Sequence, residues 1–158
     1  MIFTIKEKNY FQGDNRMSSF SFWQRWLVGA GFVMVVFGIL MALTSGTAAF
    51  DLFNRQIDPA FWGANAVGGA ARQFQQWIYA VLGATMAGWG VFLTYLARYP
   101  FSKKEPWVWN CLFLGLLVWF VLDTSLSVSY QVYFNAVSNM AFLILVGLPI
   151  VFTRKEFA

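Results

Sequence analysis

Residues 26–43 read WLVGAGFVMVVFGILMAL, a run of 18 residues in which the indole of Trp26 is the only polar side-chain group. A helix needs about 20 mainly apolar residues to cross the hydrocarbon core of a bilayer. A core helix of a water-soluble protein would keep a polar face at 3.6-residue spacing, and this run has none. The stretch therefore predicts a transmembrane helix and decides the class of fold.

Three further apolar runs extend this prediction to the rest of the chain. They cover about residues 77–97, 107–128 and 132–152. Only 11% of the 158 residues are charged, whereas soluble domains carry about 25%. The sequence predicts an all-α integral membrane four-helix bundle over residues 22–158.

The basic residues predict the orientation of the spans, because cytoplasmic loops are enriched in Lys and Arg. Nine of the eleven lie before the first span, in the second connection and in the tail. Only Arg55 and Arg72 lie in the first connection, and the third has none. Both termini are therefore expected in the cytoplasm, with the first and third connections outside.

The segment before the first span, residues 1–21, is expected to be a cytoplasmic extension. Glu7 to Gly13 (EKNYFQG) fits the E-x-x-Y-x-Q-G pattern of a laboratory protease site, and Met17 is an alternative natural start. Chance is a third reading. Residues 1–16 therefore carry no part of the functional argument.

The first connection, about residues 44–73, is the only long one. Phe50, Phe53 and Ile57 share one helical face while Asp51 and Asn54 face elsewhere, which predicts a short amphipathic helix at the outer membrane interface. The small residues of 64–71 (ANAVGGAA) indicate flexible chain leading into the second span. We expect a membrane-hugging connection, with a lid over the bundle as the alternative.

Small residues on the first two spans predict close helix packing. Gly31 and Gly38 lie seven apart on the first span. On the second span, two parallel ridges are formed by Ala80, Ala84 and Gly88 and by Gly83 and Ala87. Two interpretations stay open, which are packing within the bundle and an interface between copies of the chain.

The composition excludes several chemistries. There is no histidine and a single cysteine, Cys111, so disulfides, CxxC redox pairs, His-ligated haem or zinc, and Ser-His or Cys-His catalysis are not available. The net charge of +4 comes from short basic clusters beside the spans, which do not predict nucleic-acid binding. No catalytic residues, metal site or cofactor are expected.

Asp123 is the only acidic residue well inside a span. It lies five residues before the end of the third span, about 7–8 Å deep at 1.5 Å per residue. The fourth span returns from that side, which places polar residues at a matching depth. We predict an outer-leaflet pocket formed by Asp123, Ser127, Asn135, Ser138 and Asn139, with Arg72, Tyr79 and Trp119 as further ligand-binding candidates.

A charge inside hydrocarbon needs a partner or a water-filled pocket. Arg72 or Arg55 is the expected ion-pair partner of Asp123, since a guanidinium can hold a carboxylate in two hydrogen bonds. In the structural interpretation this pair fastens the outer loop to the bundle. In the functional one the cluster receives a small ligand, a lipid headgroup or a proton.

The strings FDLFNRQIDPAFWG, WIYAVLGATMAGWGVF and VWFVLDT, with four spans and a long first outer loop, give the chain a family resemblance. It resembles the DoxX-like group of small bacterial membrane proteins, and more closely an uncharacterised bacterial four-helix family. The resemblance covers about residues 22–155 and implies a four-helix bundle in the bacterial inner membrane. It brings no catalytic residues.

The first functional hypothesis is a non-enzymatic binding or accessory protein. Its partners would be membrane lipids or a small apolar ligand in the pocket, another membrane protein, or further copies of the chain. The alternative is a small oligomeric transporter or channel subunit with Asp123 as the ion- or proton-coupling group. A membrane enzyme is least expected, because a single carboxyl group without a second acid or base makes a poor hydrolytic site.

Overall fold

The computed structural model describes residues 3–63 and 67–157, with side chains from residue 19 onward. The elements are α1 (Phe3–Thr44), η1 (Ala48–Phe50), α2 (Asp51–Trp62), α3 (Gly69–Arg98), α4 (Pro106–Ser129), α5 (Tyr133–Thr153) and η2 (Arg154–Glu156). Within the described residues, four segments are long and apolar enough to cross a membrane: Ser19–Thr44, Gly69–Arg98, Pro106–Ser129 and Tyr133–Glu156. The predicted all-helical, four-span architecture is confirmed.

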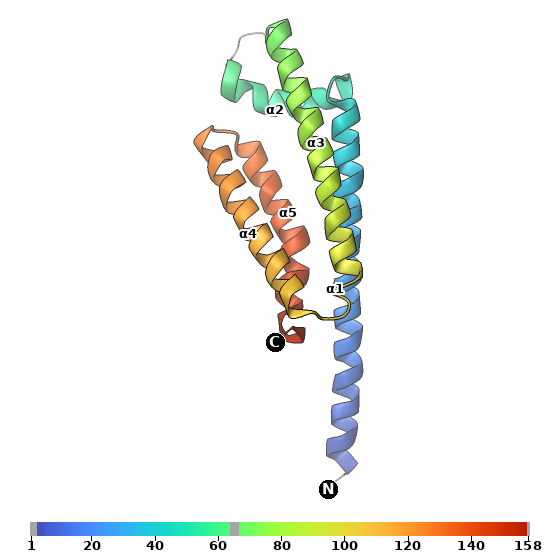
Figure 1. Cartoon of the computed structure of the whole chain (residues 1–158). Helices are drawn as coiled ribbons and strands as arrows, with labels where there is room; N and C mark the ends of the chain where they lie inside the picture. Colours follow the sequence, from blue (N-terminus) through green and yellow to red (C-terminus); the bar gives the residue numbers. More distant parts are fainter. Residues whose placement is uncertain (1–2, 64–66, 158) are drawn as a thin grey trace.

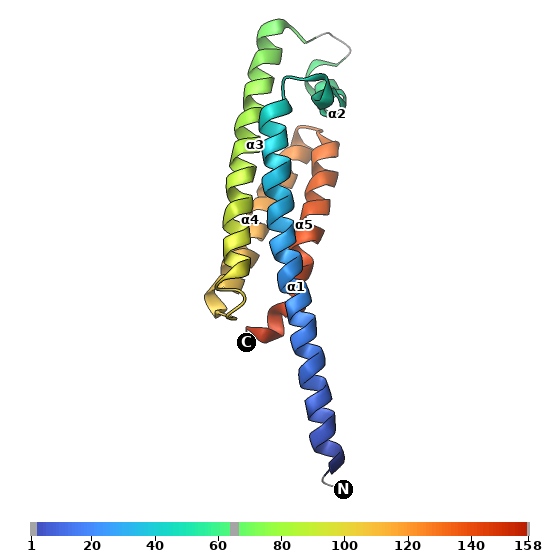
Figure 2. The ribbon, with the colours of Figure 1, turned by 90° about the vertical axis from the view of Figure 1, so that its right-hand side faces the viewer.

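The long helices form two side-by-side pairs, α1 with α3 and α4 with α5, and α1 also contacts α5 (Figure 1). Both chain termini lie at one end of the bundle, and α2 lies across the other end (Figure 1). We call these the terminal end and the α2 end. The first part of α1 extends well beyond the other helices at the terminal end (Figure 2).

Glycines bring α1 and α3 into backbone contact. A Cβ atom added to Gly38 would lie 2.5 Å from the backbone nitrogen of Ala87 and 2.5 Å from the carbonyl oxygen of Gly83. One added to Gly90 would lie 2.7 Å from the carbonyl oxygen of Gly31. Since real Cβ atoms cannot approach so closely, only glycine fits at these positions.

The two predicted ridges of α3 therefore have different roles. Gly83 is buried and faces α1, beside the half-buried Ala87, so this ridge packs within the bundle. Ala84 and Gly88 are exposed on another face of α3. Close packing against α1 uses one ridge and leaves the other outside this interface.

At the terminal end the helices share an aromatic and aliphatic core. Leu27, Phe101, Val108 and Ile150 are fully buried there. The ring of Phe101 stacks on that of Phe20, with centroids 5.7 Å apart. This core joins α1, the connection between α3 and α4, and the last turn of α5.

Two tryptophans complete the hydrogen bonding of α5 near the terminal end. Pro149 has no N–H, so the carbonyl of Leu145 loses its usual partner four residues ahead. The indole nitrogen of Trp26 donates to that carbonyl at 2.9 Å, and the indole nitrogen of Trp109 donates to the carbonyl of Ile150 at 2.8 Å. Such bonds matter in a membrane, where no water can replace them.

At the α2 end, a cluster of phenylalanine rings fixes α2 to the bundle. The ring centroid of Phe53 lies 4.8 Å from that of Phe50, 6.2 Å from Phe37 on α1 and 5.8 Å from Phe134 on α5. The helix continues through Pro59 to Trp62. These ring contacts hold α2 across this end of the bundle (Figure 2).

The second membrane helix begins earlier than predicted, at Gly69 instead of about residue 77. Its first turn closes when the backbone N–H of Arg72 donates to the carbonyl of Gly68 at 2.9 Å. This part of α3 carries Arg72 and three glutamines. Because it is polar, a prediction based on hydropathy did not include it in the helix.

Candidate ligand-binding cleft

A cleft of about 860 Å³ lies between α3 and α4, with α2 at one end. From α2 and α3 it is lined by Ile57, Phe61, Tyr79, Leu82 and Trp89, and from α4 by Leu114, Gly115, Val118, Trp119, Leu122, Asp123, Leu126 and Ser127. Tyr130, Val132 and Asn135 complete the lining. The volume falls within the range of about 300–1,000 Å³ typical of small-molecule sites.

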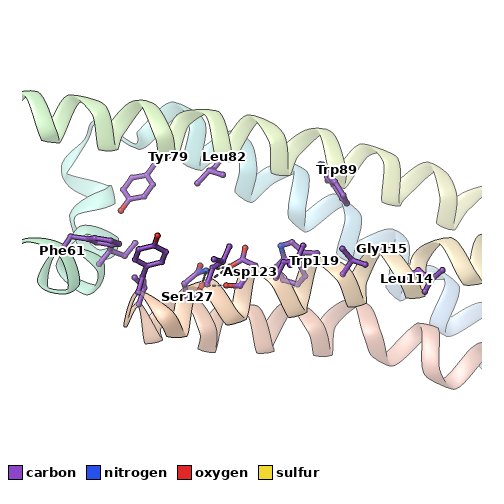
Figure 3. Close-up of a pocket in the computed structure, with 16 residues that line it drawn as sticks. Phe61, Tyr79, Leu82, Trp89, Leu114, Gly115, Trp119, Asp123 and Ser127 are labelled. Carbon is purple, nitrogen blue, oxygen red and sulfur yellow. Dashed lines mark hydrogen bonds between the residues drawn. The ribbon is translucent and has the colours of Figure 1, made fainter.

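Helical spacing explains why these residues share the cleft. On α3, Tyr79, Leu82 and Trp89 lie three and seven residues apart, which places them on one face. Trp119 and Asp123 lie four apart on α4 and face them across the gap (Figure 3). The cleft thus has apolar and aromatic walls with a carboxyl group on one side.

The Asp123 carboxyl group is held by the two asparagines of α5. The side-chain nitrogens of Asn135 and Asn139 donate to its Oδ1 at 2.7 and 2.8 Å. Ser127 Oγ lies 3.2 Å from Oδ1 but only 2.7 Å from the backbone carbonyl of Asp123. A hydroxyl has one hydrogen, so the shorter contact takes it and the amides are the main donors to Oδ1.

The second carboxyl oxygen of Asp123 has a different environment. Among the described residues, no side chain donates to Oδ2, since every hydrogen bond to this carboxyl group ends on Oδ1. No buried side-chain oxygen in the described part of the chain lacks a hydrogen-bond partner, and the half-buried Asp123 lines the cleft. Oδ2 is therefore accessible to a molecule in the cleft.

Arg72 belongs to a second polar cluster at the α2 end. Its guanidinium pairs with the Asp58 carboxylate at 2.8 Å and donates to the side-chain oxygen of Gln75 at 2.9 Å. The Gln75 amide donates to Asp58 at 2.7 Å and contacts the hydroxyl of Tyr79 at 2.9 Å. This network ties the end of α2 to the first turns of α3.

The predicted ion pairs of Asp123 are therefore wrong. Arg72 is engaged by Asp58, which lies closer to it because α2 crosses the end of the bundle. Arg55 is exposed on α2, and the described residues contain no ion pair between it and Asp123. Neutral amides, not a guanidinium, hold the carboxyl group.

The structure brings together most of the other predicted site residues. Ser127, Asn135 and Asn139 contact Asp123, and Tyr79 and Trp119 line the cleft. Ser138 does not join them, because its hydroxyl donates to the carbonyl of Phe134 in its own helix at 3.0 Å.

Sequence reasoning missed Leu82 and Trp89 on the α3 side of the cleft and Phe61 on α2 at its end. Trp89 carried a usable signal. It lies in the middle of a span, whereas membrane tryptophans concentrate at the interfaces. It also missed Thr124, whose hydroxyl accepts a hydrogen bond from Asn139 at 3.2 Å.

Comparison of the chain with protein-family models, with curated proteins and with solved structures finds no match in any of the three. The fold and the cleft define a four-span helical membrane protein with a lateral ligand-sized opening. Its function is therefore argued from the cleft alone.

Proposed function

We propose that the protein is a non-enzymatic binding or accessory protein that holds a lipid-like or small apolar molecule between α3 and α4. The observation that carries the proposal is a cleft of ligand size with mainly apolar and aromatic walls, in which the Oδ2 atom of one carboxyl group receives no hydrogen bond from the described residues. Pockets of this kind, apolar with a few placed polar groups, are typical of small-molecule sites.

The charge distribution supports a placement for this site. With nine basic residues on the side of the termini and two on the other, the positive-inside rule favours cytoplasmic termini. The cleft then opens in the outer leaflet, and α2 lies at the outer interface. A bacterial inner membrane follows from the resemblance to small bacterial four-helix proteins, which stays a prediction, as does association with another membrane protein or a second copy.

The chain offers a matched pair of variants to test the proposal. A Cβ atom added to Gly115, which lines the cleft, meets nothing within 4 Å, and the same is true at Gly88, which is exposed on α3 and does not line it. Gly115→Phe should place a ring inside the cleft and obstruct it without disturbing the packing, and Gly88→Phe adds the same ring elsewhere. Both substitutions remove a glycine from a helix.

Native mass spectrometry of protein released from mild detergent measures the outcome. We expect a bound small molecule or lipid on the wild type and on Gly88→Phe, and its loss from Gly115→Phe. Equal adducts on all three proteins, or none on the wild type, would contradict binding in this cleft.

A second candidate function is proton- or ion-coupled transport, favoured by the accessible Oδ2 of Asp123. In this case Asp123→Asn in proteoliposomes should abolish pH-dependent uptake of the bound molecule while binding of a neutral analogue persists. If the wild type shows no uptake, the transport function is refuted and the binding function is unaffected.

A further inference from the structure

We propose that the ligand of the α3–α4 cleft is a lipophilic amine, a cationic nitrogen on an apolar body without any phosphate or carboxylate group. This inference rests on the proposed binding function and names its ligand class. The cation would lie against Oδ2 of Asp123 and the apolar body against the walls formed by α3 and α4.

Among the described residues, no cation pairs with the Asp123 carboxyl group. Its polar side-chain contacts are two neutral amides and a hydroxyl, all at Oδ1. A carboxylate at membrane depth without a cation is energetically unfavourable. In the described part of the chain, both ion pairs, Arg72 with Asp58 and Lys104 with Glu156, are formed elsewhere.

The Asp123 carboxyl group is open toward the cleft. Asn135 and Asn139 hold Oδ1 on the α5 side, while Asp123 also lines the cleft (Figure 3). An ammonium group that donates to Oδ2 would make a charge-assisted hydrogen bond without displacing either amide. Such bonds are about twice as strong as those between neutral groups.

Aromatic side chains line the cleft on both sides. Trp119 lies one helical turn before Asp123, and Trp89 and Tyr79 lie on the opposite wall. A cation is attracted to the face of such rings, most strongly to tryptophan. Aromatic rings around an acidic group therefore favour a cation over a neutral hydrogen-bond donor.

The charges of the cleft do not fit a zwitterionic phospholipid headgroup. Of the described residues that line the cleft, none is Lys or Arg, so the phosphate of such a headgroup would find no positive partner there. An amine without an acidic group matches the single carboxyl of the site.

Three probes with the same adamantane body separate charge from apolar fit: adamantan-1-amine, adamantan-1-ol and adamantane-1-carboxylate. Binding is measured by equilibrium dialysis against the protein in phosphatidylcholine nanodiscs, with empty nanodiscs as the correction for partitioning. We expect the amine to bind the wild type about tenfold or more tightly than the alcohol, the difference that one charge-assisted hydrogen bond provides. The carboxylate should bind more weakly than the alcohol.

Asp123→Asn should reduce the amine to the affinity of the alcohol, while Gly88→Phe should bind all probes as the wild type does. A thermal unfolding curve tests whether Asp123→Asn is folded. If it is not, the comparison of the three probes on the wild type still decides the question.

The possible failures can be told apart. Equal binding of amine and alcohol, with both lost in Gly115→Phe, would overturn the amine and leave the binding function standing. Binding of none of the probes would count against both. Phosphatidylethanolamine in the nanodiscs should compete poorly with adamantan-1-amine. If it displaced this probe as effectively as a second water-soluble amine does, the exclusion of phospholipid headgroups would be wrong.

Discussion

Two faces of α3 contrast with each other. Toward α1 the helix presents Gly83 and Gly90, and the two backbones touch. Toward α4 it presents Tyr79, Leu82 and Trp89, and a cleft of about 860 Å³ separates the two helices. The same helix thus forms a close backbone interface on one face and one wall of the cleft on another.

Inside a membrane, apolar surface alone does not bring two helices into contact. Lipid tails are as apolar as leucine, so there is no hydrophobic force to close a gap between helices. Close contact instead needs small residues that bring many atoms within reach, as on the α1 face. The apolar walls of the cleft alone therefore identify no ligand, and only the Asp123 carboxyl group distinguishes a ligand from a lipid tail.

The largest effect is expected from breaking the tight interface. Gly38→Leu forces side-chain atoms into the backbone of α3, where a Cβ would already lie 2.5 Å from two atoms. We expect a loss of about 3 kcal/mol or more in the free energy of unfolding, at the upper end of overpacking effects. Unfolding in mixed micelles, followed by circular dichroism, measures it.

Gly29→Leu is the control for that substitution, because a Cβ atom at Gly29 meets nothing within 4 Å. It should be neutral or slightly stabilising, since leucine is a better helix former than glycine by somewhat less than about 1 kcal/mol. Similar losses in both variants would show that the close α1–α3 approach does not set the stability.

An intermediate effect is expected at the α4–α5 contact beside the cleft. Asn139 is 4% exposed and donates to both Asp123 and Thr124. Asn139→Leu keeps the branching at Cγ, is somewhat larger and removes both hydrogen bonds, which should destabilise the protein by about 1–3 kcal/mol. The matched change Asn110→Leu, at an exposed residue of α4, should have little effect, and a loss of equal size there would refute the assignment.

The smallest effect is expected at the α2 end. The side chains of Arg72 and Asp58 remain 30% and 19% exposed, and partly exposed pairs contribute about 1 kcal/mol or less. Arg72→Gln should therefore lower the free energy of unfolding by less than Asn139→Leu does. A double-mutant cycle with Asp58→Asn isolates the pair, and a coupling energy of zero would mean that this ion pair does not contribute to holding α2.

The sequence predicted the spans well because membrane helices are defined by length and apolarity, which can be read without tertiary information. The boundaries of α4 and α5 differ from prediction by about one residue. The start of α3 differs by about two turns, because a polar helical segment beyond the apolar run leaves no hydropathy signal.

The candidate site was predicted more fully on the α4–α5 side than on the α3 side, where Tyr79 was the one cleft residue predicted. Asp123 and the asparagines of α5 were found together because adjacent spans joined by a short loop must match in depth. The partner of Arg72 and the wall formed by Leu82 and Trp89 depend on how the two helix pairs are placed relative to each other. Nothing in local spacing gives that placement, so these residues required the structure.

The indole of Trp26 has a consequence for the order of assembly. Its acceptor is the Leu145 carbonyl that Pro149 leaves without a backbone donor. In a chain made from its N-terminus, Trp26 is synthesised 119 residues before that acceptor. The first span thus carries, ahead of time, the group that the last span needs in order to enter hydrocarbon without an unsatisfied carbonyl. The donor on α1 is therefore already present when α5 is synthesised.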